Sequence, residues 1–373
     1  MSVAASAATP IYEGQDFYVP AFEVRLAGRP AGQDVVRDIL SVTYKDSVQD
    51  IDSFEIAINN WDAETRAFKY SDQRLFDPGE RVELHMGYQG ALRPMLTGEI
   101  TSLRPSFPSG GGSTLAVSGL NVLHRFRTQQ ESRTYIALTD SQIAEQIAAR
   151  LKVTVETHAS TDEPRFNYLI QDNQYDVIFL MERARRAGYD LVVEERKEGQ
   201  SSRTVIVYKP STTVHHATYR LSYGKSLVEF QPELTTANQV GKVTVRGWDA
   251  LRKEAITYTA TREELKVKGV GARGGQDAIE KSIEQKAEIV ATKPVESLEE
   301  ARKLAIEILQ GIAKEMVKGT GSVPGLPDIR SGTVVEIDGV GDRFSGRYFV
   351  VSTTHTIGDS GYTTQFECRR EEV

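Results

Sequence analysis

The sequence is poor in the residues that build metal and redox centres. It has one cysteine, Cys368, and six histidines among 373 residues. A lone cysteine excludes an intramolecular disulfide and is typical of a reducing compartment. His215 and His216 are neighbours, which in a strand places them on opposite faces, and no H-x-x-x-H, C-x-x-C or H-E-x-x-H spacing is present. We therefore expect neither a metal nor a cofactor.

Long apolar runs and blocks of basic charge are also missing. No segment reaches the roughly 20 apolar residues that cross a bilayer. The N-terminus, MSVAASAATP, lacks the charged start and apolar centre of a secretory signal. The formal net charge is −7 and the basic residues are spread along the chain, so no basic face for nucleic acid is expected. These absences predict a cytoplasmic protein with no membrane segment and no nucleic-acid specificity.

Two glycine-rich stretches are candidates for ligand-binding loops. GVGARG at 269–274 matches the dinucleotide fingerprint G-x-G-x-x-G, but that motif follows a buried strand and the preceding TREELKVK is highly charged. A mobile glycine loop is favoured there. GVGDRFSG at 339–346 lies between TVVEI and RYFVVST, which favours a hairpin turn.

Single reactive side chains point to packing more than to catalysis. His355 lies in the strand-like YFVVSTTHTI, with Phe349 and Val351 on its face, and is interpreted as a packed structural side chain. Cys368 lies in QFECRR and is interpreted as a small core residue. No catalytic residue is predicted.

What the sequence does contain is strand patterning interrupted by helical segments. FYVPAFEVRLAG and SFEIAINNWD alternate apolar and polar residues, as half-buried strands do. TDSQIAEQIAARL begins with a capping box, Thr139 and Gln142, and a helix at 298–317 begins at Ser297 with Gly319 beyond its end. The predicted fold is mainly β with α+β insertions: two similar β-barrel domains, a small α/β module and a long helix.

The length of the chain favours two or three domains. The patterning predicts three, preceded by an N-terminal arm. The predicted parts are a flexible arm at 1–14, a first β-barrel domain at 15–126, an α/β module at 127–213, and a second β-barrel domain at 214–373 with a helical insertion at about 276–318.

A repeated motif supports the two-barrel prediction. PGERVELHMGY, from Pro78, and SGTVVEIDGVG, from Ser331, share a turn glycine followed by a strand, and each is followed by a further glycine and two more strands. The equivalent residues in the two copies are the candidate interface residues: Gly79, Val82, Glu83 and Gly98 in the first, and Gly332, Val335, Glu336 and Gly346 in the second. The rims around 78–100 and 330–350 are therefore predicted to be contact surfaces.

Two other functions stay open on the residues alone. One is a hydrolase of cell-wall polymers, with Glu83 or Glu336 as acid or nucleophile, which requires a second carboxyl roughly 5–10 Å away. The other is a carbohydrate-binding β-module, for which an exposed row of aromatic residues would be the sign.

The order of several phrases over roughly residues 20–370 resembles the late control protein D family of contractile-tailed phages, which is close in fold to the hub portion of VgrG spikes and to the baseplate hubs of contractile injection systems. The phrases are SFEIAINNWD, LFDPGERVELHMGY, LTGEITSLRPSF, LAVSGLNVLHRF, TDSQIAEQIAARL, QYDVIFLMERARRAGYDL, LVEFQPEL, GLPDIRSGTVVEIDGVGDRFSGRYFVVSTTHTI and GYTTQFECRR.

The resemblance implies a structural hub that is a homotrimer, with six barrels in a ring that adapts a six-fold inner tube to a three-fold spike. It implies as partners the inner tube protein, other baseplate proteins and a separate spike or tip protein of VgrG or PAAR type, since the sequence ends soon after the second β-copy. It also implies assembly in the bacterial cytoplasm and a final place in a phage tail or injection particle.

Overall fold

The computed structural model describes residues 9–10, 19–72, 74–158, 163–198, 201–210, 217–249, 252–265, 283, 289–292, 295 and 297–370. Within the predicted arm at 1–14, the described residues form strand β1, Thr9–Pro10, which pairs in parallel with β16, Ala217–Ser222. The glycine stretch at 269–274, His215 and His216 lie outside the described residues.

The first β-unit contains six strands wrapped around one apolar core. In chain order they are β2 (Pro20–Leu26), β4 (Ile39–Ser47), β5 (Ser53–Asn59), β8 (Arg81–Tyr88), β9 (Ala91–Ser106) and β10 (Thr114–Asn121). Their order in the sheet is β2-β8-β9-β10-β5-β4. Alternate residues of β5 and β10 are buried, as the sequence pattern predicts for strands with one face on a core.

The second β-unit repeats this arrangement. Its strands are β16, β17 (Glu229–Leu234), β21 (Val317–Pro324), β22 (Val334–Asp338), β23 (Gly346–Gly358) and β24 (Gly361–Arg370), in the order β16-β22-β23-β24-β21-β17. Strand for strand, the chain order and the sheet order match those of the first unit. One difference is direction: β16 runs parallel to β22, whereas β2 runs antiparallel to β8.

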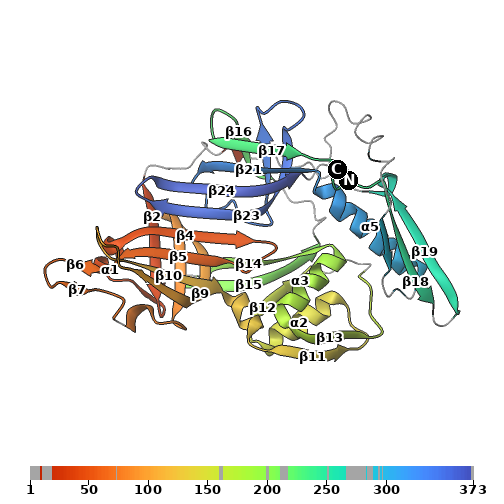
Figure 1. Ribbon diagram of the computed structural model, residues 1–373, viewed down its shortest axis with the longest axis horizontal. Helices are drawn as coiled ribbons and strands as arrows, with labels where there is room; N and C mark the ends of the chain where they lie inside the picture. Colours follow the sequence, from red (N-terminus) through yellow and green to blue (C-terminus); the bar gives the residue numbers. More distant parts are fainter. Residues whose placement is uncertain are drawn as a thin grey trace.

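The predicted mainly β fold is confirmed, and Figure 1 shows how its parts are placed. The second β-unit lies above the first, and the α/β module lies below the junction between them. The module contains β11 (Gln130–Tyr135), α2 (Asp140–Arg150), β12 (Thr154–Thr157), β13 (Leu169–Tyr175), α3 (Asp176–Ala187), β14 (Tyr189–Glu198) and β15 (Ser201–Pro210). Thr139 and Gln142 form the predicted capping box of α2.

The insertion in the second unit is larger than the predicted segment at about 276–318. Its core begins at Val240, because β18 (Lys242–Asp249) pairs with β19 (Glu254–Thr261) and β20 (Ile289–Thr292), and this sheet packs on α5 (Leu298–Lys314). Helix α5 also ends earlier than predicted. Gly319 lies inside β21, where a Cβ atom would come within 2.8 Å of the Phe230 ring, so its role is strand packing and not helix termination.

Short elements complete the described chain: β3 (Arg29–Pro30), α1 (Gln33–Asp38), β6 (Trp61–Asp62), β7 (Ala67–Phe68), and 3-10 helices at Arg74–Phe76, Val122–Arg127 and Arg262–Glu264. Among the described residues, no helix combines the length and apolar character needed to span a membrane.

Candidate functional site at the junction of the two units

The two β-units are joined edge to edge by β4 and β23. These strands pair antiparallel, with Val42 opposite Ile357, Tyr44 opposite His355 and Asp46 opposite Thr353. Strand β23 is long enough to pair with β22 through its first half and with β4 through its second. One continuous sheet therefore runs from the first unit into the second.

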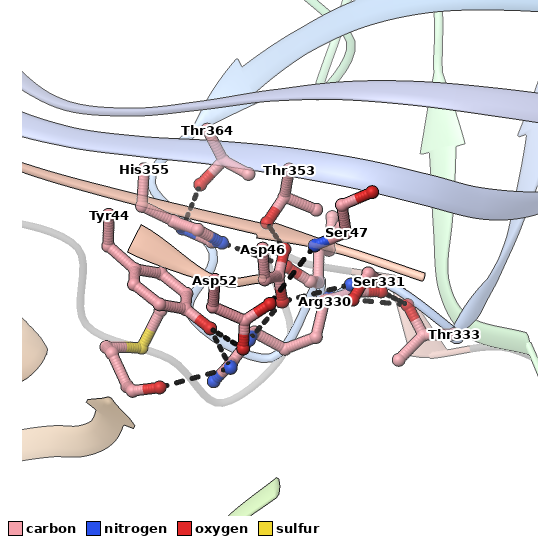
Figure 2. A network of polar contacts seen from close by, with 12 residues as sticks. Tyr44, Asp46, Ser47, Asp52, Arg330, Ser331, Thr333, Thr353, His355 and Thr364 are labelled. Carbon is pink, nitrogen blue, oxygen red and sulfur yellow. Dashed lines mark hydrogen bonds and ion pairs between the residues drawn. The ribbon is translucent and has the colours of Figure 1, made fainter. Parts of the chain in front are cut away.

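A buried ionic network lies at this junction, as Figure 2 shows. Arg330, in the loop before β22, contacts Asp46 with Nε and Oδ2 2.6 Å apart, and its Nη2 donates to the Met95 carbonyl at 3.1 Å. The guanidinium also contacts the Tyr44 hydroxyl and lies 4.7 Å above that ring. The Asp46 side chain is 2% exposed and that of Arg330 is 18% exposed. A cation from the second unit is thus held by groups of the first.

Asp46 also joins the units through a second set of bonds. Its carboxylate accepts from the Thr353 hydroxyl of β23 and, at 3.1 Å, from the backbone N–H of Ser331. A carboxylate that accepts several hydrogen bonds and faces a guanidinium is well compensated for burial.

Asp52 is the second buried carboxyl of the network. It accepts from the Asn121 amide at 2.8 Å, from the Ser47 backbone N–H at 3.3 Å and from the Tyr44 hydroxyl at 3.4 Å. Burial, and then repulsion from Asp46, raises the pKa of Asp52 to about 7, although Arg330 favours the ionised form. Two carboxyl groups therefore share one cation.

His355 and Cys368 are packed core residues, as predicted. The His355 ring is fully buried, with Nε2 3.0 Å from the Ile329 carbonyl and Nδ1 3.0 Å from the hydroxyls of Tyr362 and Thr364. Burial lowers its pKa to about 4, more than Asp46 raises it. Cys368 is 2% exposed, and burial raises the pKa of its thiol.

The side chains of Arg330, Asp46, Asp52 and Tyr44 bond to one another and to neighbouring groups of both β-units. The network therefore serves to hold two β-units in one fixed orientation. Within the part of the chain that the structure describes, no group of three or more His, Cys, Asp or Glu residues is arranged to hold a metal.

The sequence reasoning did not single out Arg330, Asp46 or Asp52. One signal was present: Val42, Tyr44 and Asp46 share one face of β4. An aspartate in the inward register of an apolar strand requires a buried partner.

The α/β module supports the junction from below. Thr97 of β9 donates from its backbone N–H and its hydroxyl to the Glu195 carboxylate of β14, at 3.0 and 3.1 Å. Val192 of the same strand belongs to a small apolar cluster that packs against Val48, just after β4. Burial raises the pKa of Glu195.

The predicted turn glycines occupy equivalent places in the two units. Gly79 has φ +95° and Gly332 has φ +81°, a region that favours glycine. The backbone N–H of Gly79 donates to Ile100 at 2.8 Å, and that of Gly332 donates to Val350 at 2.9 Å. Ile100 and Val350 are therefore equivalent positions of β9 and β23.

Four other predicted residues surround these turns. Val82 and Val335 are both fully buried in the cores of their units and cannot contact a partner directly. Glu83 pairs with Arg81 at 3.0 Å and is 7% exposed in its side chain, whereas Glu336 pairs with Arg220 at 3.5 Å and is 35% exposed. The structure brings Glu83 and Glu336 to matching strands of separate units.

Gly98 and Gly346, the glycines that follow the repeated motif, differ by two residues in strand register. Val82 pairs with Gly98, but Val335 pairs with Tyr348, and Gly346 pairs with Ile337. Gly98 is needed because a Cβ atom there would collide with the carbonyl of Leu120. Gly346 has φ +146° at the start of β23. The two glycines therefore have different structural causes.

A family model described as the Alg8 N-terminal domain matches residues 19–359, which include the first β-unit, the module and the second β-unit as far as the end of β23. This chain belongs to that family. No curated protein matches the chain.

Solved structures share the fold over most of the chain. The 43 kDa tail protein of prophage MuSo2 from Shewanella oneidensis has a TM-score of 0.70 at 14% identity, covering 94% of this chain and 98% of that chain. The tail protein from Neisseria meningitidis MC58 has a TM-score of 0.67 at 15% identity, covering 95% and 97%. The E. coli protein c3393, described as a component of the type VI secretion system, has a TM-score of 0.54 at 12% identity, covering 94% and 79%.

These likenesses establish that the chain has the fold of phage tail proteins. Membership of the late control protein D family stays a prediction.

Proposed function

We propose that this protein is a structural hub subunit of the baseplate of a contractile tail or injection particle. Three copies would present six β-units in a closed ring, adapting a six-fold inner tube to a three-fold spike. The observation that carries the proposal is the repeated six-strand topology, in which both units have the same strand order. The shared fold with phage tail proteins supports it.

The buried junction supplies the mechanical requirement of such an adapter. A ring of six similar units closes only if each unit meets the next at a fixed angle. Within the chain, the contacts of Arg330 and Asp46 and the pairing of β4 with β23 set one such angle. The predicted partners are the inner tube protein, other baseplate proteins and a separate spike or PAAR-type tip protein.

The proposed role is structural and includes no catalysis. Glu83 and Glu336, the alternative residues of the hydrolase hypothesis, are each ion-paired within their own unit, Glu83 with Arg81 and Glu336 with Arg220. Cell-wall polymer should therefore be degraded no faster by the wild-type protein than by Glu83→Gln or Glu336→Gln. Turnover that either variant abolished would restore the hydrolase hypothesis.

A carbohydrate-binding role is less well supported. Trp61, Phe68 and Phe107 do cluster, with ring centroids 5.5 and 5.0 Å apart. Their rings meet edge to face, at 62° and 66°, and so do not form the flat row that stacks on a sugar.

Mass measurement in solution tests the hub proposal. Sedimentation of the purified chain, alone and with its tube and spike proteins, should reveal a species of three times 41.4 kDa, about 124 kDa, that binds both partners. A chain that remains monomeric in both conditions would exclude the trimeric hub. A trimer that binds neither protein would exclude the tail role.

A further inference from the structure

Within the described residues, each β-unit has one strand edge that mirrors the intramolecular junction and pairs with no other strand. Among the described strands, β17 pairs with β21 alone, and β9 beyond Ile100 pairs with β10 alone. In Figure 1 these two edges lie at opposite ends of the stacked strands, β17 near the top and β9 toward the bottom. Resting on the trimer proposed above, we infer that β17 of one copy pairs antiparallel with the outer half of β9 of the next copy.

The equivalence of the strands fixes the register of this pairing. Cross-strand neighbours lead from β4 to β9 in the first unit and from β17 to β23 in the second, in matching steps. The two paths are Tyr44, Phe54, Gly119, Ile100 and Pro232, Gly319, Cys368, Val350.

Both paths end at the residue that bonds the turn glycine, and both strands bulge at the next position. The register shifts between Ser118 and Gly119 in one unit and between Val350 and Ser352 in the other. Tyr44 is therefore equivalent to Pro232, and Ile100 to Val350.

Within the chain, Tyr44 lies opposite His355, five residues after Val350. The equivalent pair between copies is Pro232 opposite Pro105, five residues after Ile100. The same register places Glu233 opposite Arg104.

Two prolines agree with this register. A proline is tolerated in a sheet where its nitrogen faces away from the paired neighbour, so Pro105 and Pro232 direct their backbones toward the open edges. The backbone N–H of Thr235 donates to the carbonyl of Met316, just before β21. Because successive residues of a strand direct their N–H and C=O groups to opposite sides, the backbone of Pro232 is directed away from β21, toward the open edge. In the inferred register both missing N–H donors fall in one residue pair, and the flanking pairs stay free to bond.

The side chains along the two edges are complementary. Arg104 and Glu233 are both exposed, and Arg104 pairs within the chain with Glu55 at 2.5 Å. In the inferred register Glu233 would lie opposite Arg104 and add a second carboxylate to that pair between copies.

At one end Phe107, 59% exposed and packed on Phe68 within its own unit, would lie opposite Phe230, whose partly buried ring packs on Tyr348. Val228, 68% exposed, would lie beside them. Exposed apolar residues at matching ends of two unpaired edges indicate a surface that a partner covers.

Disulfide trapping tests the register. In Arg104→Cys/Glu233→Cys, the two Cα atoms of a non-hydrogen-bonded pair should lie about 4.5 Å apart, within the range of a disulfide. The control, Arg104→Cys/Gln231→Cys, keeps the same faces but shifts the register by two residues, to about 7–8 Å. The native Cys368 is buried and does not compete.

Under mild oxidation we expect the first variant to accumulate covalent trimer, read on non-reducing gels, at least about ten-fold faster than the control. A disulfide also traps short-lived encounters between copies, so covalent trimer should accumulate even if the ring dissociates readily. A trimer by mass with no preference for the first variant would overturn this pairing and leave the trimer standing. Absence of both trimer and cross-link would overturn the two proposals together, and a ladder beyond three copies would contradict ring closure.

Discussion

At the scale of single residues, Arg330 is the cation that compensates the buried carboxylate of Asp46. Asp46 and Asp52 belong to the first β-unit and Arg330 to the second. Arg330 and Asp46 are 284 positions apart in sequence, and their contact joins the two units. Removing one partner of a buried pair leaves an uncompensated charge, whereas an exposed pair contributes little.

We expect Arg330→Met to lower the free energy of unfolding by about 3–5 kcal/mol near neutral pH, because Asp46 loses its cation. The loss should shrink toward pH 5, as Asp52 takes up a proton. Arg93→Met is the matched control: Arg93 is 61% exposed and lies 3.4 Å from Asp328, so its loss should be about 0–1 kcal/mol. Urea unfolding measures both, and similar losses in the two variants would contradict the role given to Arg330.

The raised pKa of Asp52 predicts a pH dependence of stability. Folded Asp52 holds its proton up to about pH 7, whereas the unfolded side chain releases it near 3.8, the ordinary pKa of an aspartate. The stabilisation by this group is thus present below about pH 4 and is lost as pH rises toward 7. Asp52→Asn cannot titrate and should lose less stability over that window.

His355 contributes the opposite slope, because its pKa is lowered from 6.5 to about 4: its stabilisation is present above pH 6.5 and is lost as pH falls toward 4. The difference between wild type and Asp52→Asn, measured by urea unfolding across pH 4–8, isolates Asp52. Parallel curves would refute the assignment. The control Asp50→Asn changes an exposed aspartate and should alter the free energy of unfolding at neutral pH by no more than about 0.5 kcal/mol.

Residue-level prediction from sequence succeeded where the local pattern carries the cause. Burial of His355 and Cys368 follows from their places in apolar strands. The ionic network could not be predicted in this way, because its partners are brought together by the pairing of β4 with β23.

At the scale of elements, the turns before β8 and β22 are the clearest sign of duplication. Both glycines adopt positive φ, and both donate to the equivalent residue of the next strand. The shared hydrogen bond identifies the pairs more reliably than glycine identity does, as the mismatch of Gly98 and Gly346 shows.

Alanine at these turns should be costly in both units. Gly79→Ala and Gly332→Ala are each expected to lower the free energy of unfolding by about 1–2 kcal/mol, since an L-residue is strained at positive φ. Gly332→Ala should cost more, because its Cβ would lie 3.1 Å from Val192 Cγ1. Gly110→Ala, where no atom lies within 4 Å of the added Cβ, is the control in chemical unfolding. Equal stability of Gly79→Ala and Gly110→Ala would show that the turn is not strained.

The limits of α5 illustrate what element prediction misses. Ser297 caps the helix as its sequence indicates, accepting from the Glu300 backbone N–H. The end at Lys314 is set by tertiary packing, because Val317–Pro324 is taken into the sheet between β17 and β24. Glycine at 319 suits either a helix end or a close-packed strand, and only the Phe230 ring beside it decides between them.

At the scale of the whole molecule, the inferred ring makes a prediction for hydrogen exchange. In the separated chain, amides in 42–47 and 352–357 should exchange slowly, because β4 and β23 pair with each other. In the equivalent segments 230–235 and 102–107, the amides that face the open edges should exchange quickly in the separated chain. Their exchange should become slow when the copies associate. Mass-spectrometric exchange at low and high protein concentration measures this. Protection confined to the α/β module on association would locate the interface elsewhere.

The sequence by itself determined the strand character, the duplicated turn motif and the placing of a helical module between two β-rich parts, because these follow from local periodicity and from backbone demands at glycine. Only the tertiary structure decided that the insertion begins near Val240, that Gly346 is not the equivalent of Gly98, and that Arg330 serves Asp46. The physical reason is that strand register and buried charge pairing depend on which distant edges meet. That choice is made by the packing of whole units, and no short stretch of sequence contains it.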